Sequence, residues 1–367
     1  VRTYRMKDLK YLAAYIIPAL AIYGLLQGGY WAWSAVIFAF GLIPLVEPFL
    51  PSSTRNVTEN ERNTLLGRRL FDWLLYLNVP VVYAIIALFM WQLPIADWTS
   101  AELTGQILSV GIVLGACGIN VGHELGHRTE WGEQLLAKLL LLPSFYTHFF
   151  IEHNRGHHKN VATDLDPASA RRGEMIYTFW VRSVVYSYLS AWRLETKRLE
   201  KSSIPFWSWQ NEMLRFTGAQ LAYLTLLVFL LPRGEYAWVV LAGIIGFLLL
   251  ETINYIEHYG LRRKQLASGR YERVRPMHSW NSNAQMGRIV LYELTRHSDH
   301  HFIANKKYQI LDHHEEAPEL PYGYPSSMLM ALVPPLWFAV MNRRIPDTSQ
   351  AIASPKSART GQAVPSQ

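Results

Sequence analysis

Six long apolar segments constrain the fold of this chain more than any other feature of its sequence. Each is about as long as the roughly 20 helical residues that cross a bilayer core. Short loops join them into three pairs, which predicts three antiparallel hairpins. We therefore expect an all-α integral membrane protein with six transmembrane helices. The predicted spans lie at about residues 11–28, 31–50, 71–93, 103–121, 214–231 and 237–255.

The composition agrees with a membrane protein and limits its metal chemistry. Half of the residues are hydrophobic and only 17% are charged, whereas soluble domains are about one quarter charged. The single cysteine, Cys117, excludes a disulfide framework, a cysteine-based zinc site and an iron–sulfur centre within this sequence. Any metal here is therefore expected to have nitrogen and oxygen ligands.

The placement of the basic residues predicts the orientation in the membrane. Lysine and arginine are retained in short loops on the cytoplasmic side. They gather before the first span and between the second and third spans, whereas the three tight loops on the other side contain only Arg233. We expect a multi-pass protein of the cell inner membrane with both termini cytoplasmic. The net charge of +7 is then a property of this face, and nucleic acid is not an expected partner.

The composition also divides the chain into two regions. Residues 1–344 are predicted to form one membrane domain. Residues 345–367 contain Ser, Ala, Gln, Pro and Thr but no aromatic residue and no Leu. Such a segment cannot bury a core, so we expect a disordered tail or a linker.

Nine of the 13 histidines fall in four places that lie on the predicted cytoplasmic side. Most are spaced three or four residues apart, which puts them on one face of a helix. They are His123, His127, His153, His157, His158, His258, His297, His300 and His301. Nine imidazoles exceed what one ion can bind, so the pattern predicts a cytoplasmic helical region with a histidine-rich dimetal site of four or five nitrogens per ion. Imidazole binds iron, zinc, copper and nickel alike.

The run from His123 to His127 also matches HExxH, in which two histidines bind zinc and Glu acts as the general base. The extended form of that motif requires Gly and His at positions that Glu130 and Glu133 occupy. An intramembrane zinc protease would also leave seven histidines unexplained. We therefore disfavour that alternative.

Carboxylates and one amide lie close to these histidines in the sequence. A metal-bound histidine usually donates its other ring N–H to such a group. The expected partners are Glu124, Glu152, Asp164, Asn254, Glu257 and Asp299, with Asp166 beside Asp164.

The motifs HELGHR, EHNRGHH and HSDHH resemble the three histidine boxes of the membrane di-iron fatty acid desaturase and hydroxylase superfamily. The run NYIEHYGL at residues 254–261 is similar to a signature of the bacterial membrane-bound alkane 1-monooxygenases. Thr295 stands where that family's third box is expected to have Gln. No histidine is missing.

The resemblance implies that the nine histidines hold two iron ions. It further implies a monooxygenase reaction in which O2 and two electrons convert a medium-chain linear alkane to the primary alcohol and water. A terminal C–H bond offers nothing to acid–base catalysis, so a redox metal is required. An apolar channel would admit the chain end, with Phe38, Phe40, Leu114 and Ile119 as candidate lining residues.

The electrons are expected to come from another domain or protein. The sequence has no Gly-rich nucleotide fingerprint and no four-cysteine site, so we expect no haem, flavin or nucleotide in this chain. The resemblance implies a rubredoxin, fused through the tail or separate, and its NAD(P)H-dependent reductase. Rubredoxins are acidic, and basic residues could dock one. The candidates are Arg171, Arg172, Arg262, Arg263 and Lys264.

Two other functions remain open at this point. An acyl-lipid desaturase or hydroxylase of the same superfamily would use the same histidines. A metal transporter would instead be favoured by charged residues in the middle of the spans, and the predicted spans contain very few.

Overall fold

The computed structural model describes residues 6 to 346, and every regular element in that part of the chain is a helix. The segments that build the spans are η1 (Met6–Tyr15), α1 (Ile16–Gln27), η2 (Gly29–Trp33), α2 (Ser34–Ile37), η3 (Phe38–Leu42), α3 (Ile43–Val46), η4 (Glu47–Phe49), α5 (Leu70–Tyr76), α6 (Asn78–Gln92), α7 (Ser100–Val113), η5 (Leu114–Ile119), α8 (Asn120–Gly126), α13 (Glu212–Leu230) and α14 (Tyr236–His258).

The other helices lie between the spans or after them. They are α4 (Glu59–Leu66), α9 (Trp131–Leu141), η6 (Leu142–Ser144), α10 (Phe149–Glu152), η7 (His153–His157), α11 (His158–Asn160), α12 (Ile176–Lys201), η8 (Pro276–His278), α15 (Gln285–Val290), α16 (His297–Phe302), η9 (Tyr308–Ile310), α17 (Tyr324–Ala331) and α18 (Pro334–Met341). The tail predicted for residues 345–367 lies, from residue 347 onward, outside the described residues.

Six helical stretches are long and apolar enough to cross a membrane, which confirms the predicted fold class. They run over Asp8–Gln27, Gly29–Phe49, Leu70–Gln92, Ser100–Gly126, Glu212–Leu230 and Tyr236–His258. The fourth stretch continues beyond its predicted end and carries His123 on its last turns. The sixth likewise ends on His258. Both spans therefore deliver a histidine directly to the end of the membrane region.

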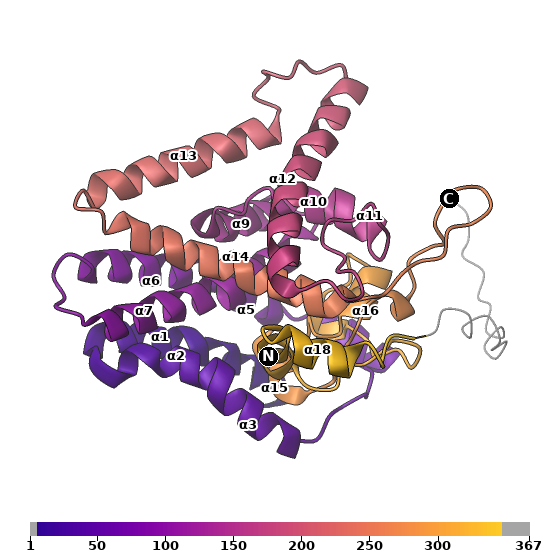
Figure 1. Ribbon diagram of the computed structural model, residues 1–367, viewed down its shortest axis with the longest axis horizontal. Coiled ribbons are helices and arrows are strands. Elements are labelled where there is room, and N and C mark those ends of the chain that lie inside the picture. The colour runs from indigo at the N-terminus through magenta and orange to yellow at the C-terminus, as the bar shows by residue number, and fades with distance from the viewer. Residues whose placement is uncertain (1–5, 347–367) are drawn as a thin grey trace.

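The fourth span is the centre of the bundle, since 83% of its apolar window is buried, against 17% for the fifth. Figure 1 shows α7 beside α14, with α13 at the edge of the molecule. Small residues permit the close packing of α14. A Cβ on Gly243 would lie 2.7 Å from the carbonyl oxygen of Pro143, and one on Gly111 would lie 2.5 Å from Ile245 Cγ2. Close approach at glycine is a usual way for membrane helices to associate.

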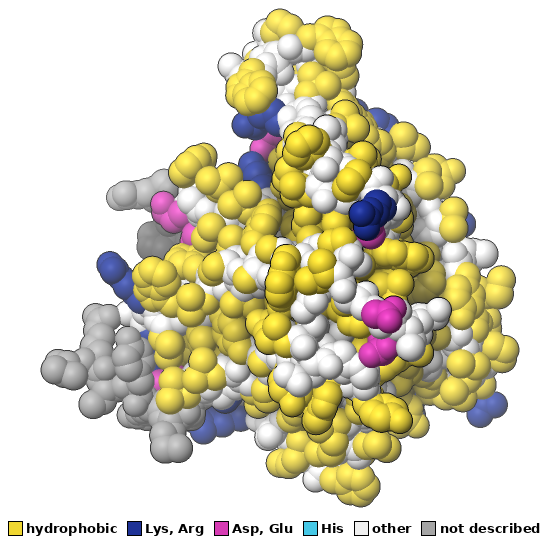
Figure 2. All heavy atoms as spheres, turned by 90° about the vertical axis from the view of Figure 1, so that its left-hand side faces the viewer, with side chains coloured by type: hydrophobic (Ala, Val, Ile, Leu, Met, Phe, Trp, Pro, Cys, Tyr) yellow, Lys and Arg dark blue, Asp and Glu magenta, His cyan; other side chains and the backbone are white. Residues whose placement is uncertain are grey.

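The two ends of the bundle differ in character. At one end, three short loops connect the hairpins, and Figure 2 shows this face covered mainly by hydrophobic side chains with few charges. At the other end, the short helices α15, α16 and α18 gather near the end of α14 (Figure 1). The histidine-bearing segments lie at this second end.

Candidate metal centre

The nine histidines of the four sequence clusters converge at one place in the fold. His123 lies in α8, and His127 is the first residue after this helix. The second cluster extends from η7 into α11, the third position is the last residue of α14, and the final cluster belongs to α16. Segments far apart in the sequence thus bring their imidazoles together. This agrees with the prediction that all four clusters lie on the same side of the spans.

The imidazoles form two separate groups. The five-histidine group contains His123, His127, His153, His158 and His300, and the four-histidine group contains His157, His258, His297 and His301. Within each group, the candidate ligand atoms lie within 4.8 Å of one another. The predicted division of four or five nitrogens per metal therefore matches the arrangement in the structure.

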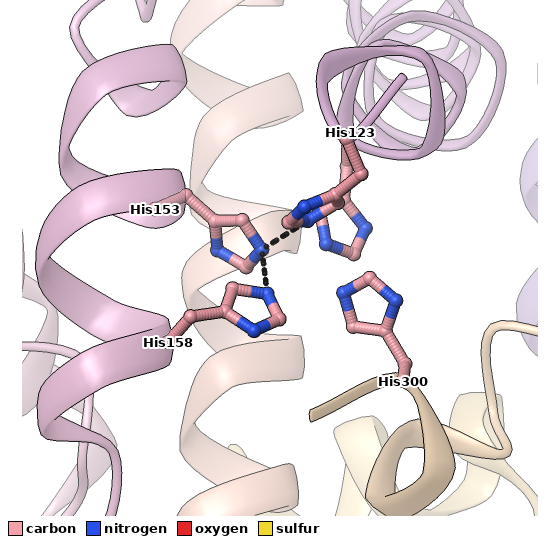
Figure 3. Close-up of side chains that lie close together, drawn as sticks. His123, His153, His158 and His300 are labelled. Carbon is pink, nitrogen blue, oxygen red and sulfur yellow. Dashed lines mark hydrogen bonds between the residues drawn. The ribbon is translucent and has the colours of Figure 1, made fainter. Parts of the chain in front are cut away.

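In the five-histidine group, the rings point at a common centre. Figure 3 shows His123, His153, His158 and His300 directed toward one another. Nε2 of His153 lies 3.1 Å from Nε2 of His127 and 2.9 Å from Nε2 of His158. His300 sits opposite, and neither of its buried ring nitrogens has a hydrogen-bond partner.

The four-histidine group is fully buried. Nε2 of His157 lies 3.2 Å from Nε2 of His301, and the same distance separates Nε2 of His297 from Nε2 of His258. Each of these rings therefore turns the same nitrogen toward the shared centre.

The protonation state of these rings suits metal binding. Burial, reinforced by the neighbouring rings, holds the pKa values of His153, His158 and His300 well below the ordinary value. These rings are therefore neutral, and neutral imidazole is the form that binds a metal. Buried nitrogens without partners are costly, so the donor set fits two transition-metal ions.

An aspartate orients one of the histidines of the four-histidine group. Oδ2 of Asp166 lies 2.9 Å from Nδ1 of His157 and also accepts a hydrogen bond from Ser169. Burial lowers the pKa of His157, but Asp166 outweighs it and raises the pKa overall. This contact leaves Nε2 of His157 free for a metal, the usual arrangement of a histidine ligand and its carboxylate.

The prediction for Asp164 is wrong, because its side chain is 73% exposed and lies 3.7 Å from Arg262. Asp164 belongs to the turn after α11, where neighbouring side chains point in different directions. Its neighbour Asp166 points inward. Both residues follow the second histidine cluster, and their sequence positions alone did not show which of them faces the histidines.

Three other predicted carboxylates are buried, but none has a direct contact with the histidine groups in the structure. Glu124 accepts hydrogen bonds from Arg128 and from the backbone N–H of Tyr308, which also removes it from the role of a protease base. Asp299 receives hydrogen bonds from His314 and the backbone of Asp312 and forms an ion pair with Lys306. It therefore fixes α16 to the following loop.

Glu152 is the third of these buried carboxylates. Its Oε1 has no hydrogen-bond partner among the described residues. Burial, and next the charge of Asp166, raise the pKa of Glu152 to about 8. Asn254 and Glu257, in contrast, lie on the wall of a cavity that reaches the histidines. Among the predicted partners in the described part of the chain, only Asp166 and Glu257 have a carboxylate in contact with a histidine of the two groups.

An apolar cavity connects the membrane spans with both histidine groups. Its wall includes Ile17, Ile43 and Ile112 from the spans, and His123 and His297 from the two histidine groups. The empty space between its lining atoms amounts to about 870 Å³, including the part that is open to the surroundings. Ile112 and His123 both belong to the fourth span and are eleven positions apart, which corresponds to about 16 Å along a helix axis.

Of the four predicted channel residues, the structure places only Phe40 on the cavity wall. Phe38 does not line it, and Leu114 and Ile119 are buried in the core instead. Phe38–Leu42 and Leu114–Ile119 are wider π-helical turns, and in such turns the residues that share a face differ from those of an α-helix.

The sequence reasoning missed several residues of the site. Gly115 and Ala116 line the cavity in place of Leu114 and Ile119. Phe149 packs on the rings of His123 and His153. Tyr324 donates a hydrogen bond of 2.6 Å to Oε1 of Glu257. A shift in helical period leaves no signal in the residue types, and Tyr324 belongs to a segment distant from every motif.

The basic residues predicted to dock a donor do not share one environment. Arg171, Arg172 and Lys264 are exposed. Arg262 is half-buried near Asp164, and Arg263 donates to the backbone carbonyls of Glu272 and Lys159, so it supports the fold.

Comparison with known proteins gives consistent results over most of the chain. The family model of fatty acid desaturases matches residues 98–329. The chain is 40% identical to alkane 1-monooxygenase 1 of Pseudomonas aeruginosa over 86% of its own length and 83% of the relative. It is 37% identical to an alkane 1-monooxygenase of Acinetobacter baylyi, covering 94% and 87% of the two chains.

A more distant relative has a different name. The chain is 27% identical to the hydroxylase component of the xylene/toluene monooxygenase of Pseudomonas putida, over 95% of this chain and 92% of the relative.

Proposed function

The chain belongs to the fatty acid desaturase family, and we propose that it is a membrane-bound di-iron monooxygenase that hydroxylates the terminal methyl group of medium-chain linear alkanes. The observation that carries this proposal is the apolar cavity that ends on both histidine groups. The names of the relatives support the same reaction, since several are alkane 1-monooxygenases.

The five- and four-histidine groups would each hold one iron ion. Iron of this kind supplies the activation of O2 that an inert C–H bond requires, whereas zinc has no redox chemistry. The overall reaction consumes one alkane, one O2, two electrons and two protons, and it releases one 1-alkanol and one water. Because most of the cavity wall is apolar and histidines form part of it, the alkane would lie in it with one end at the histidines.

The shape of the cavity would also favour reaction at the end of the alkane chain. An alkane has no polar group, so it is positioned by shape alone. Phe40 from the second span and Leu249 and Ile253 from α14 line the cavity, so they would keep the alkane extended along the fourth span. The terminal carbon would then meet the end of the cavity that bears His123 and His297.

We propose that reduced rubredoxin, separate or fused beyond the tail, supplies the electrons and is itself reduced by an NAD(P)H-dependent reductase. Arg171, Arg172 and Lys264 are exposed cations that would attract an acidic partner. The backbone N–H of Gly260, two residues after His258, donates to the carbonyl of Ala170, directly before Arg171. A donor bound there would be close to the four-histidine group.

The proposed location is the inner membrane, with the histidines and both termini on the cytoplasmic side. The charge asymmetry of the loops supports this orientation. An alkane dissolves in the bilayer core and could enter laterally, while a water-soluble donor would approach from the cytosol.

The test uses the full chain in nanodiscs, loaded with iron and supplied with rubredoxin, its reductase, NADH and dodecane. We expect 1-dodecanol, detected by gas chromatography, in an amount that depends on O2. Absence of the alcohol with two irons bound would contradict the proposal. Oxidation of acyl lipids with no reaction on dodecane would favour the acyl-lipid desaturase or hydroxylase instead.

A further inference from the structure

Glu257 stands out among the carboxylates near the histidines, because it alone combines a contact to a ring with a place on the cavity wall. It lies in the last turn of α14, is 2% exposed, and directly precedes His258. Its Oε2 lies 3.1 Å from Nε2 of His297. Its Oε1 accepts the hydrogen bond of Tyr324.

The separations between the ring nitrogens give a standard against which this contact can be judged. Neighbouring Nε2 atoms within the two groups lie 2.9 to 3.2 Å apart. Two ligands with bonds of about 2.1 Å to one metal, at right angles, lie about 3.0 Å apart. These distances therefore match those expected between neighbouring ligands of one metal ion. The distance from Glu257 to His297 has the same length and ends on the same Nε2 atom.

A hydrogen bond alone describes this contact less well. Nε2 of His297 lies close to two atoms at once, Oε2 of Glu257 and Nε2 of His258. A ring nitrogen carries at most one proton, so it can donate to only one of them. A shared metal ion accounts for both close contacts together.

We propose that Oε2 of Glu257 is a ligand of the metal ion bound by the four-histidine group. This inference rests on the metal binding in the proposed function, not on the identity of the substrate. Each metal would then have five protein ligands, but one of the two sites would include a carboxylate. The two ions would therefore differ in charge environment, and the ion nearer the carboxylate would be stabilised in its more oxidised state.

Tyr324 would act as a positioning residue for this ligand. Its hydroxyl holds Oε1 of Glu257, so that Oε2 remains available to the metal. The backbone supports the same geometry, since the N–H of Trp280 donates to the carbonyl of Glu257 at 2.8 Å. Tyr324 thus holds the side chain of Glu257, and Trp280 holds its backbone.

The chain offers a closely matched control on the same helix. Glu251 is also buried, and its Oε1 accepts a 2.7 Å hydrogen bond from Tyr146. In the described part of the structure it forms no hydrogen bond or ion pair with the histidine groups, and only its charge acts on His157. The pairs Glu257–Tyr324 and Glu251–Tyr146 therefore differ mainly in their contact with His297.

The experiment compares the wild type with Glu257→Gln and Glu251→Gln, each purified as the full chain in nanodiscs and loaded with ⁵⁷Fe. Mössbauer spectra of the resting protein report each iron separately. We expect Glu257→Gln to change the signal of one iron only and to weaken binding of that iron by at least about 100-fold, beyond the range for outer partners. Glu251→Gln should leave both signals unchanged.

A second measurement uses the wild-type protein and does not depend on the folding of a variant. Infrared difference spectra between the iron-free and iron-bound forms should show a carboxyl group of the protein becoming metal-bound. That signal should persist in Glu251→Gln and disappear in Glu257→Gln. Two irons with unchanged Mössbauer signals in Glu257→Gln would overturn the proposal, as would a wild-type difference spectrum without any carboxylate signal.

The variant Tyr324→Phe separates positioning from ligation. It should keep both irons but shift the infrared signal of the bound carboxylate, since Oε1 loses its hydrogen bond. An unchanged signal would remove Tyr324 from the positioning role. Because no readout depends on turnover, a failure to oxidise alkanes would leave this test intact.

Discussion

Oδ2 of Asp166 lies 2.9 Å from Nδ1 of His157, on the opposite side of the ring from the four-histidine group. The carboxylate thereby fixes both the orientation of the imidazole and the nitrogen that is offered to a metal. Loss of such a partner typically costs 10–100-fold in metal affinity.

Replacement of Asp166 by Asn should weaken iron binding by about 10- to 100-fold, because the amide holds Nδ1 of His157 less strongly than the carboxylate does. Competition with a chelator measures the change. The exposed residue Asp164, two positions away, gives the matched control Asp164→Asn. Equal affinities for the two variants would contradict the role assigned to Asp166.

Substitution of His300 should affect only one of the two groups. Both of its ring nitrogens are buried without partners, so His300→Ala removes a donor from the five-histidine group and no structural hydrogen bond. We expect the iron content to fall from two ions per chain toward one. His301→Ala should remove the other ion, and the two variants should lose different Mössbauer signals. Loss of the same signal in both would argue against two separate sites.

The cavity predicts which residue of the second span controls substrate size. Phe40 lines the cavity and Phe38 does not, although both are half-buried. Phe40→Ala should enlarge the cavity and shift the product profile toward longer alkanes, as measured by gas chromatography of a mixed substrate. Phe38→Ala should leave the profile unchanged. A shift of the same size in both variants would show that the effect is not local.

The packing of α14 predicts a stability difference between two glycines. A Cβ on Gly243 would lie 2.7 Å from the backbone oxygen of Pro143, whereas one on Gly218 would meet nothing within 4 Å. Gly243→Ala should destabilise the protein by about 1–3 kcal/mol through overpacking. Gly218→Ala should be neutral or slightly stabilising. Thermal unfolding in detergent compares the two, and a neutral Gly243→Ala would mean that α14 moves away without cost.

The ion pairs of Glu293 predict how stability depends on pH. Lys10 lies 2.7 Å from one carboxylate oxygen and Arg288 lies 2.5 Å from the other. Burial alone would raise the pKa of Glu293, but these cations outweigh it and hold the pKa below the ordinary value of 4.5. The stability from this carboxylate is therefore present above pH 4.5 and is lost as the pH falls through the lower pKa of the folded state.

The variant Glu293→Gln tests this dependence. It should be less stable than the wild type by about 2 kcal/mol near neutral pH, because the hydrogen bonds to charged groups are weakened. The difference should shrink below the pKa of the folded protein, where the wild-type carboxyl is also neutral. A difference that stays constant into acid would indicate that shape, not charge, matters at this position.

The sequence alone determined the features that depend on residue type and spacing along the chain. The six spans follow from apolar length, because a helix that crosses a bilayer must be apolar over a fixed distance. The nine candidate metal ligands were predicted from the helical spacing of the histidines in four clusters. The division into two sites with four or five nitrogens each was predicted from the usual coordination number of a metal ion. The structure agrees with all three.

The tertiary structure decided what depends on the direction of side chains and on contacts between distant segments. It assigned His157 and His158, neighbours in sequence, to different groups. It showed that Asp166 contacts His157, whereas Asp164, in the same turn, is exposed. It also showed that Gly115 lines the cavity, whereas Leu114, in the same π-helical segment, does not. It brought Tyr324 to Glu257 across 67 residues. Such contacts arise only when helices pack, so local sequence patterns do not encode them in readable form.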